Sequence, residues 1–424
     1  ERAPSRLAPH AGFDAYYRHV ARVADADVWD AAFAAFQRPV ATTIRVHAHS
    51  PLAPLATRML AAWTRPARNA VLRGAAVGDA VLAPGFPREL VAAAQEAGAL
   101  SRQELNSMLP PLLLGVEPHH AVLDLCCAPG SKTLELLDLL ATRDGPGTGL
   151  LIANDANRGR LVTAAQRARR QEARRRSLVL TASDARYFST TKIFVPGMRG
   201  ARTLRFDRVL ADVPCSGDGT MRRSPGGWAA WAVRDGLSLH TKQFAILKRA
   251  VEVLKPGGRL LYSTCSLNPV ENEAVVLAAI RFFAARPSGP PITLAVVPAP
   301  AGAGQPGLTS WRVPHPQFWE IWTSVMRRGG EGEDDSDVAA RVAACSFAEF
   351  GEVPAALVEK RKGVRLCASM FPGRSGEAGG ADAERAQLSG CARALPLDGQ
   401  EIGGFFCALL ERAAVEDAPA ASSA

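Results

Sequence analysis

The sequence lacks the patterns that mark metal sites, disulfide frameworks and membrane spans. Its eight cysteines include no C-x-x-C pair and no accompanying His-x-x-x-His group, so we expect no structural zinc. Their spacing matches no disulfide framework either, which is typical of a reducing compartment. No apolar run approaches the roughly 20 residues that a membrane-spanning helix needs, and no signal-peptide pattern opens the chain. We therefore expect neither a metal nor a membrane partner.

The glycine fingerprints of nucleotide-binding enzymes are missing as well. The glycine turn nearest to them is DLCCAPGSKT (124–133), which is not G-x-G-x-x-G and shares only its ending with a P-loop. Pyrophosphate binding is therefore the weaker interpretation of this turn.

The composition is that of a globular protein with a sizeable core. The 424 residues are 47% hydrophobic and carry a formal net charge of +9, in which arginine predominates. This length allows two or three domains. Because the planar guanidinium suits phosphate, the charge favours a polyanionic partner. Codon bias explains the charge equally well, because the chain is also rich in Ala, Gly and Pro.

The first part of the chain predicts a small mixed α/β domain. We expect residues 13–37 to be helical, with Asp27 as an N-cap before an apolar-periodic stretch, and a strand to follow over 42–48. Ser101 and Glu104 have the S-x-x-E spacing of a capping box, which predicts that a helix begins there.

From residue 121 short buried strands alternate with helical segments. Continuous apolar runs in this alternation predict a doubly wound, mostly parallel sheet of the α/β class, covered on both faces. Each strand ends in an acid or a cysteine, and open α/β sheets bind ligands at the carboxyl ends of their strands. The predicted strands are 121–127, 150–155, 177–184, 207–213 and 258–265.

Two inserts and a tail interrupt or follow this core. One insert covers 189–206, and the other covers 286–395 and contains the acidic segment GGEGEDDSD (329–337). We expect the second insert to be a mobile loop. A last strand is predicted over 403–412, and residues 413–424 are expected to be a disordered tail.

Acids at successive strand ends favour an adenosine-type cofactor. Asp155 can accept the hydroxyls of a ribose, and Asp184 can meet an exocyclic amine. Each acid, taken alone, is as well explained as a helix N-cap.

Cys215 and Cys265 differ from the other cysteines. Cys215 follows one predicted strand and Cys265 ends another, both at the ligand-bearing edge, and the next residues are Ser216 and Ser266 instead of bulky apolar residues. Such positions lower a thiol's pKa and expose it, as nucleophilic catalysis requires. We expect four other cysteines to pack as small hydrophobic residues: Cys345, Cys367, Cys391 and Cys407.

Taken in order, several motifs resemble the Sun-type RNA cytosine-5 methyltransferases, and within them the eukaryotic multisite tRNA methyltransferases. They include DLCCAPGSKT (124–133), FDRVLADVPCSGDGTMRR (206–223) and LKPGGRLLYSTCSLNPVENEAVV (254–276). The resemblance implies a class I methyltransferase-like fold with an RNA-facing N-terminal domain at 1–95 and a methyltransferase domain at 96–412. It also implies methyl transfer from S-adenosyl-L-methionine to cytosine carbon 5 in RNA through a covalent cysteine–cytosine intermediate. The expected RNA substrate is tRNA.

The resemblance implies a role for individual residues. Cys265 is the implied nucleophile, Cys215 assists release of the enzyme, Asp212 binds the cytosine edge and Lys132 adds positive charge nearby. Cys127 departs from the family pattern, which has alanine there. The implied cofactor-binding residues are Cys126, Cys127, Ala128, Pro129, Gly130, Ser131, Lys132, Asp155, Asp184 and Asp212.

Two stretches are candidates for RNA binding. The basic helix at 158–176 places three arginines on one face, although such a stripe is more often only solvated. Residues 220–231 combine two arginines with tryptophans that either stack on a base or pack in the core. The candidates are Arg167, Arg170 and Arg174, with Arg222, Arg223, Trp228 and Trp231.

Two rival functions remain open at this stage. One is a non-catalytic RNA-binding or assembly factor with the same fold, which would leave the four catalytic candidates without a task. The other is a nicotinamide-dependent oxidoreductase, whose glycine fingerprint this sequence lacks. We expect a monomer. The resemblance implies a nuclear or nucleolar location, with the cytoplasm as the alternative. A mitochondrial location stays open, because the sequence begins at Glu1 without a methionine.

Overall fold

The structure is a computed structural model of the chain. Some predicted features lie outside its described residues: Arg174, most of the 189–206 insert, most of the acidic segment 329–337 and the end of the tail. The structure describes residues 10–61, 63–66, 78–82, 87–142, 145–170, 177–189, 192–193, 202–286, 291–326, 335–359, 364–372, 380–397 and 400–414.

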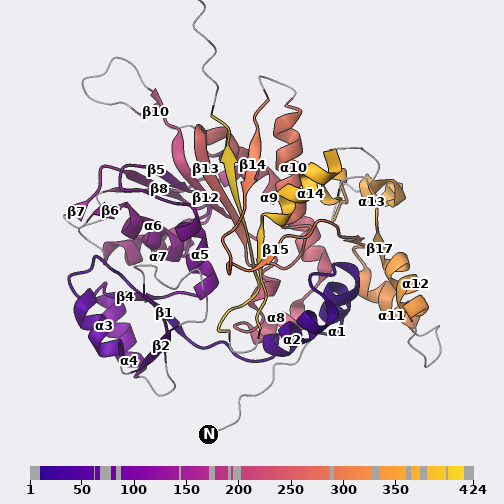
Figure 1. Cartoon of the computed structure of the whole chain (residues 1–424), viewed down its shortest axis with the longest axis horizontal. Coiled ribbons are helices and arrows are strands. Elements are labelled where there is room, and N and C mark those ends of the chain that lie inside the picture. Colours follow the sequence, from indigo (N-terminus) through magenta and orange to yellow (C-terminus); the bar gives the residue numbers. More distant parts are fainter. Residues whose placement is uncertain are drawn as a thin grey trace, which may run out of the picture.

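A nine-stranded sheet forms the centre of the molecule (Figure 1). Five parallel strands are followed at one side by an antiparallel group, so the doubly wound, mostly parallel sheet is confirmed. In spatial order the parallel strands are β9 (Leu178–Thr181), β8 (Leu150–Asn154), β5 (Ala121–Asp124), β12 (Phe206–Asp212) and β13 (Leu254–Thr264). The antiparallel strands are β19 (Phe405–Arg412), β18 (Ala392–Ala394), β15 (Gln305–Pro306) and β14 (Leu294–Val297), which pairs with β19.

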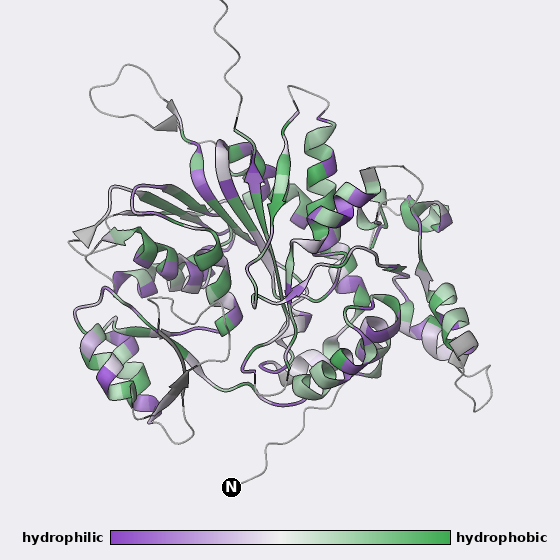
Figure 2. Ribbon diagram, viewed as in Figure 1, coloured by the Kyte–Doolittle hydropathy of each residue, from purple (hydrophilic) through white to green (hydrophobic). Residues whose placement is uncertain are grey.

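Successive residues of each central strand enter opposite cores, because side chains alternate across a strand. Leu123 and Leu260 belong to one core cluster, whereas their neighbours Val122 and Leu261 belong to the other. Both faces are therefore apolar, which explains the continuous hydrophobic runs, and Figure 2 colours β5 and β8 largely green. Helices α5 (Leu105–Leu113) and α6 (Ser131–Leu140) cover the second face, and α9 (Val233–Val253) and α10 (Glu273–Ala284) cover the first.

A second, smaller sheet lies toward the N-terminus and has its own core. Ile44, Leu60, Val91 and Leu100 are buried together there. The predicted boundary at residue 95 falls just before the last strand of this sheet; the domain division itself stays a prediction. The elements are β1 (Thr43–Val46), α3 (Ala53–Ala61), β2 (Thr64–Pro66), β3 (Gly78–Leu82), α4 (Arg88–Glu96) and β4 (Leu100–Arg102), paired in the order β2-β3-β1-β4.

The first helices pack on the large core and not on the small sheet. The helical character predicted for 13–37 is confirmed, but in separate pieces: α1 (Ala11–Ala15) runs into a π-helical turn, η1 (Tyr16–Val20), and α2 (Ala26–Phe36) follows. Asp25 takes the N-cap position of α2 in place of Asp27. The break follows the burial, since both segments turn aromatic side chains into the same cluster.

The capping box predicted at Ser101 is also wrong. Ser101 lies in β4 opposite Arg45 of β1, so strand pairing holds its backbone extended. Glu104 occupies the N-cap position of α5 without capping it through its side chain. Its carboxylate accepts a hydrogen bond from the backbone of Gly403 at 3.0 Å instead.

The 286–395 insert was expected to be a mobile loop, and the structure contradicts this. Its described residues form helices and strands whose apolar side chains, among them Trp311, Phe318 and Leu388, are buried in the large core. Besides β14, β15 and β18, these elements are β16 (Val313–Pro314), α11 (Phe318–Met326), α12 (Asp335–Cys345), β17 (Ser346–Phe347), α13 (Ala355–Val358) and α14 (Gly380–Ser389). Among the described helices of the whole chain, none combines the length and apolar composition needed to cross a membrane.

We predict that Phe13→Ala destabilises the whole fold. Phe13 is fully buried, and its ring contacts the rings of Tyr17, Trp29 and Trp228. Truncating a buried phenylalanine costs about 3–5 kcal/mol of unfolding free energy. Chemical denaturation measures this loss. The matched control, Leu55→Ala, alters a side chain that is 56% exposed and should change the unfolding free energy by less than about 0.5 kcal/mol. If both variants lost the same unfolding free energy, the buried packing of Phe13 would be contradicted.

Candidate active site

The loop between β5 and α6 makes a close turn at the carboxyl edge of the sheet. Its Gly130 has φ +101°, a backbone conformation that favours glycine. A Cβ atom at this position would lie 3.0 Å from the Cβ of Ala164, so the loop also passes close to the next helix, α7 (Arg158–Arg169). Two arginines of α7 hold the loop: Arg160 donates to the carbonyl of Ala128, and Arg167 donates to Ser131 Oγ at 2.9 Å.

The acids at the ends of β8 and β9 have different surroundings. Asp155 is buried and accepts hydrogen bonds from the backbone amides of Ala128, at 3.0 Å, and Asn157, at 2.8 Å. It therefore faces the β5–α6 loop. Asp184 caps a short 3₁₀ helix and forms an ion pair of 2.7 Å with Arg186, whose hydrogen bonds lower the pKa of the carboxyl. The N-cap role considered for Asp184 is thus observed.

Asp124 was not among the predicted site residues. It ends β5, is buried, and accepts a hydrogen bond from Thr133 Oγ1 at 2.8 Å. Its Oδ1 atom has no hydrogen-bond partner within the described part of the chain. Burial raises the pKa of Asp124 to about 7, and the hydrogen bond from Thr133 opposes this shift. Its place at a strand end, shared with Asp155 and Asp212, is the signal that could have identified it.

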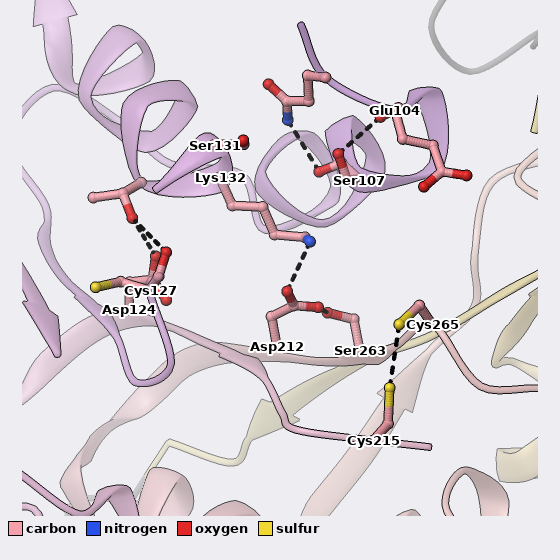
Figure 3. Close-up of polar contacts among 12 residues, drawn as sticks. Glu104, Ser107, Asp124, Cys127, Ser131, Lys132, Asp212, Cys215, Ser263 and Cys265 are labelled. Carbon is pink, nitrogen blue, oxygen red and sulfur yellow. Dashed lines mark hydrogen bonds and ion pairs between the residues drawn. The ribbon is translucent and has the colours of Figure 1, made fainter. Parts of the chain in front are cut away.

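Lys132 and Asp212 form an ion pair beside the loop. Lys132 Nζ lies 2.7 Å from Asp212 Oδ2, and the other carboxylate oxygen accepts from Ser263 Oγ at 2.7 Å (Figure 3). Burial lowers the pKa of Lys132, but the attraction of Asp212 and its hydrogen bond outweigh burial and leave the pKa raised. The ammonium group is therefore charged at neutral pH. Ser263, one strand position before Thr264, was not predicted either.

The sulfur atoms of Cys215 and Cys265 lie 3.3 Å apart and face each other in Figure 3. Cys215 follows β12, and Cys265 directly follows β13, its parallel neighbour. The hydrogen bond with Cys265, together with burial, raises the pKa of the Cys215 thiol well above its usual range. Cys215 is thus a thiol at neutral pH, placed to donate its proton toward the second sulfur.

The remaining cysteines have no comparable partner geometry. Burial raises the pKa values of Cys126 and Cys127 well above their usual range, so both stay protonated. Burial also raises the pKa of Cys345 to about 12 and that of Cys407 to about 12. Cys391 is buried as well, and Cys367 is partly exposed with its sulfur 3.2 Å from Ser369 Oγ.

Two of the residues predicted to bind RNA are not available to a ligand. Arg222 is 8% exposed and donates to backbone carbonyls, among them that of Ile402 at 2.6 Å. Trp228 is 2% exposed and packs against Phe13. Both predictions fail because the helices at 11–36 and the chain near 400 cover this stretch, which the sequence pattern could not reveal.

The other basic candidates reach the surface. The Arg223 side chain is 43% exposed and forms an ion pair of 3.0 Å with Glu104. Arg170 is exposed at the C-terminal end of α7. Arg167 is half-buried because it binds the β5–α6 loop, and burial lowers the pKa of its guanidinium.

One group in the described part of the chain has the residue types of a metal site. Ligand atoms of Glu117, His119 and His120 lie within 4.8 Å of one another. His120 Nδ1 already accepts a hydrogen bond from the Glu117 amide at 2.9 Å. The group precedes β5, at the edge of the sheet opposite to the cysteines.

Comparisons with known proteins agree with this geometry. Residues 111–287 match the family described as 16S rRNA methyltransferase RsmB/F. This segment, which is less than half of the chain, is similar to that family. The matched segment includes the loop after β5, the ion pair and both facing cysteines.

Two relatives extend the similarity. The multisite-specific tRNA:(cytosine-C(5))-methyltransferase of Saccharomyces cerevisiae is 46% identical over 184 residues, which are 43% of this chain and 27% of that protein. The tRNA (cytosine(34)-C(5))-methyltransferase of Drosophila melanogaster is 35% identical over 323 residues, 74% of this chain and 37% of that protein. The chain therefore spans about a third of the length of the curated relatives it matches.

A solved structure supports the fold. The NSun6 protein of Pyrococcus horikoshii, crystallised with SFG, aligns over 95% of this chain and 97% of its own with a TM-score of 0.58. At 16% sequence identity this likeness concerns the fold alone. It confirms the class I methyltransferase-like fold expected from the sequence.

We predict that Gly130→Ala is more harmful than Gly257→Ala. Both glycines have positive φ, +101° and +72°, where alanine is strained by about 1–2 kcal/mol. Only Gly130 is crowded, whereas a Cβ at Gly257 meets no atom within 4 Å. Denaturant titration should show a larger loss of unfolding free energy for Gly130→Ala, and similar losses would show that the loop can move away from α7.

Proposed function

We propose that this chain methylates carbon 5 of cytosine in RNA, with tRNA as the substrate class and S-adenosylmethionine as the methyl donor. The observation that carries the proposal is the pair of sulfur atoms 3.3 Å apart, next to the ion pair of Lys132 and Asp212. The names of the relatives from yeast and fly support the substrate class. As the chain matches only part of these relatives, the activity is proposed for the segment that matches the family model.

The chemistry explains why a thiol is needed. Carbon 5 of cytosine is too electron-poor to attack a methyl group by itself. A thiolate that adds to carbon 6 converts the ring to an enamine, whose carbon 5 is nucleophilic. We assign this addition to Cys265, because the neighbouring Cys215 retains its proton and can donate it toward the Cys265 sulfur.

Asp212 and Lys132 act on the ring. The Asp212 carboxylate is held by Lys132 and Ser263, so its orientation is fixed before a base arrives. A hydrogen bond between this carboxylate and the cytosine edge requires a proton on one partner and stabilises the electron-rich adduct. Lys132 supplies the compensating positive charge in a mostly buried setting.

The residues around the β5–α6 loop fit an adenosyl cofactor. The buried Asp124 oxygen without a partner points to a missing donor, and Asp155 lies beside the loop amides. We assign the loop 126–132, Asp124 and Asp155 to cofactor binding, with Asp212 at its reactive end. S-Adenosylmethionine supplies a methyl group on a positively charged sulfur when bound. SFG in the archaeal neighbour is an analogue of this cofactor, which supports the assignment.

RNA binding is assigned to the exposed arginines. Arg170 and Arg223 are exposed. Exposed arginines contact phosphates without reading the base sequence. A cytosine within a paired stem must leave the stack before carbon 6 can meet a thiolate. The RNA-facing role of residues 1–95, a monomeric state and a nuclear location stay predictions.

We predict opposite effects for the two cysteine variants. Cys265→Ala removes the nucleophile, so methylation of bulk tRNA should fall by about 10³-fold or more and no covalent RNA adduct should form. Cys215→Ala should still form the adduct but release it slowly, so that an RNA-linked species accumulates on denaturing gels. The reverse pattern would exchange the two roles.

Two measurements complete this test. Cys345→Ala is the matched control, since that buried thiol lies outside the site, and it should leave methylation within about 2-fold. Equilibrium dialysis with labelled S-adenosylmethionine should show binding by the wild type and by both site variants. A wild type that binds RNA but neither the cofactor nor RNA covalently would favour a non-catalytic RNA-binding factor.

A further inference from the structure

Two buried carboxylates bind the chain segments that contain Cys215 and Cys265, and the proposed reaction uses neither of them. Glu271 is 0% exposed and Asp218 is 2% exposed. Glu271 belongs to the chain that follows Cys265, and Asp218 belongs to the chain that follows Cys215. Each carboxylate binds the segment of the other cysteine, so the two cysteine segments are joined in both directions.

Glu271 accepts four hydrogen bonds from three residues. Its Oε2 atom accepts from the hydroxyls of Ser216 and Ser266, both at 2.6 Å. Its Oε1 atom accepts from the Ser216 amide at 2.8 Å and from Gln243 Nε2 at 2.9 Å. Ser216 and Ser266 directly follow Cys215 and Cys265, so one carboxylate fixes the residue next to each sulfur.

Asp218 makes the reciprocal connection. It accepts from the backbone amide of Leu267 at 2.8 Å and from the hydroxyl of Tyr17 in the η1 turn. Beside it, the Gly219 amide donates to the carbonyl of Cys265 at 2.9 Å. The backbone of the nucleophile segment is thus held by the segment of its partner cysteine.

The arrangement suits the ionised form of Glu271. Burial, and then repulsion by Asp218, raise the pKa of Glu271 to about 7, while the hydrogen bonds from the serines oppose this shift. The Ser216 amide and Gln243 Nε2 can only donate, so Oε1 must accept, whereas the two hydroxyls at Oε2 can either donate or accept. A buried charge is a costly way to stabilise a fold, and apolar replacements are often as stable. The hydrogen bonds of Glu271 to both cysteine segments indicate a role in the site instead of a role in stability.

We infer that Glu271 is a positioning residue that sets the distance between the Cys215 and Cys265 sulfur atoms through Ser216 and Ser266. The inference rests on the proposed function. Formation of the adduct needs only the Cys265 sulfur at carbon 6. Release also needs the group assigned to assist it, Cys215, at its place beside Cys265. Loosening the connection therefore slows release more than formation.

Glu271→Gln tests the inference while keeping the side-chain size. The amide oxygen can take the place of Oε1 and accept from the Ser216 amide and Gln243 Nε2, which leaves the NH₂ group facing the two serine hydroxyls. Ser216 Oγ can turn to accept from this group, but it then donates to Ser266 Oγ at 3.2 Å, whose other lone pair accepts from the Asn268 amide at 3.0 Å, so one N–H of the NH₂ group is left without an acceptor. With bulk tRNA, kcat for methylation should fall about 10- to 100-fold and KM should stay within about 3-fold.

Adduct formation is measured separately with tRNA that contains 5-fluorocytosine. Fluorine on carbon 5 cannot leave as the proton does, so the adduct is trapped once the methyl group has been transferred. Glu271→Gln should trap this RNA within about 3-fold of the wild-type rate, and it should accumulate an RNA-linked species on unmodified tRNA. Ser216→Ala/Ser266→Ala should show the same split, because it removes both hydroxyl donors.

The control is Glu135→Gln, which changes another fully buried glutamate. Glu135 accepts from Gln103 Nε2 at 2.7 Å and contacts neither cysteine segment. It should lower thermal stability without separating formation from release. If Glu271→Gln slows trapping as much as turnover, leaves turnover unchanged, or fails to fold while the double serine variant shows no split, the inference is wrong. A wild type without any adduct would instead refute the proposed function.

Discussion

The parallel register between β12 and β13 is the constraint on which the site depends. It places Asp212 opposite Ser263, so the two strands end side by side and their following residues enter the same space. The cysteines stand 50 positions apart in the sequence and yet come within 3.3 Å. Because the register is fixed by apolar side chains entering both cores, the chemistry at the strand ends is set by packing several residues away.

The site combines unlike charges within a few ångströms. Asp212 compensates the Lys132 ammonium, and Asp124 beside it has a pKa of about 7. The thiol proton of Cys215 adds a neutral donor next to the sulfur that is proposed to act as the nucleophile. Such a site is arranged before any ligand arrives, which lowers the reorganisation needed during reaction.

The sequence pattern predicted those elements that depend on neighbouring residues in the chain. The central strands, β1 and the turn at Gly130 were recognisable because each has a periodicity or a residue type that demands its structure. The errors concern tertiary contacts: Ser101 entered a strand through pairing with β1, and Arg222 and Trp228 became buried beneath segments distant in sequence. Asp124, in an apolar run, and Glu271, in a polar segment, were overlooked because the role of a buried acid shows only when its partners are known.

The Arg222 guanidinium spans several parts of the chain that the sequence separates widely. It donates to the carbonyls of Arg38 and Pro39 and to those of Gln400 and Ile402. These hydrogen bonds connect the residues that follow α2 and the residues that precede β19 to the segment that contains Cys215. Two segments far apart in the sequence therefore bury the same arginine, and the loss of either one would leave a buried guanidinium with fewer acceptors.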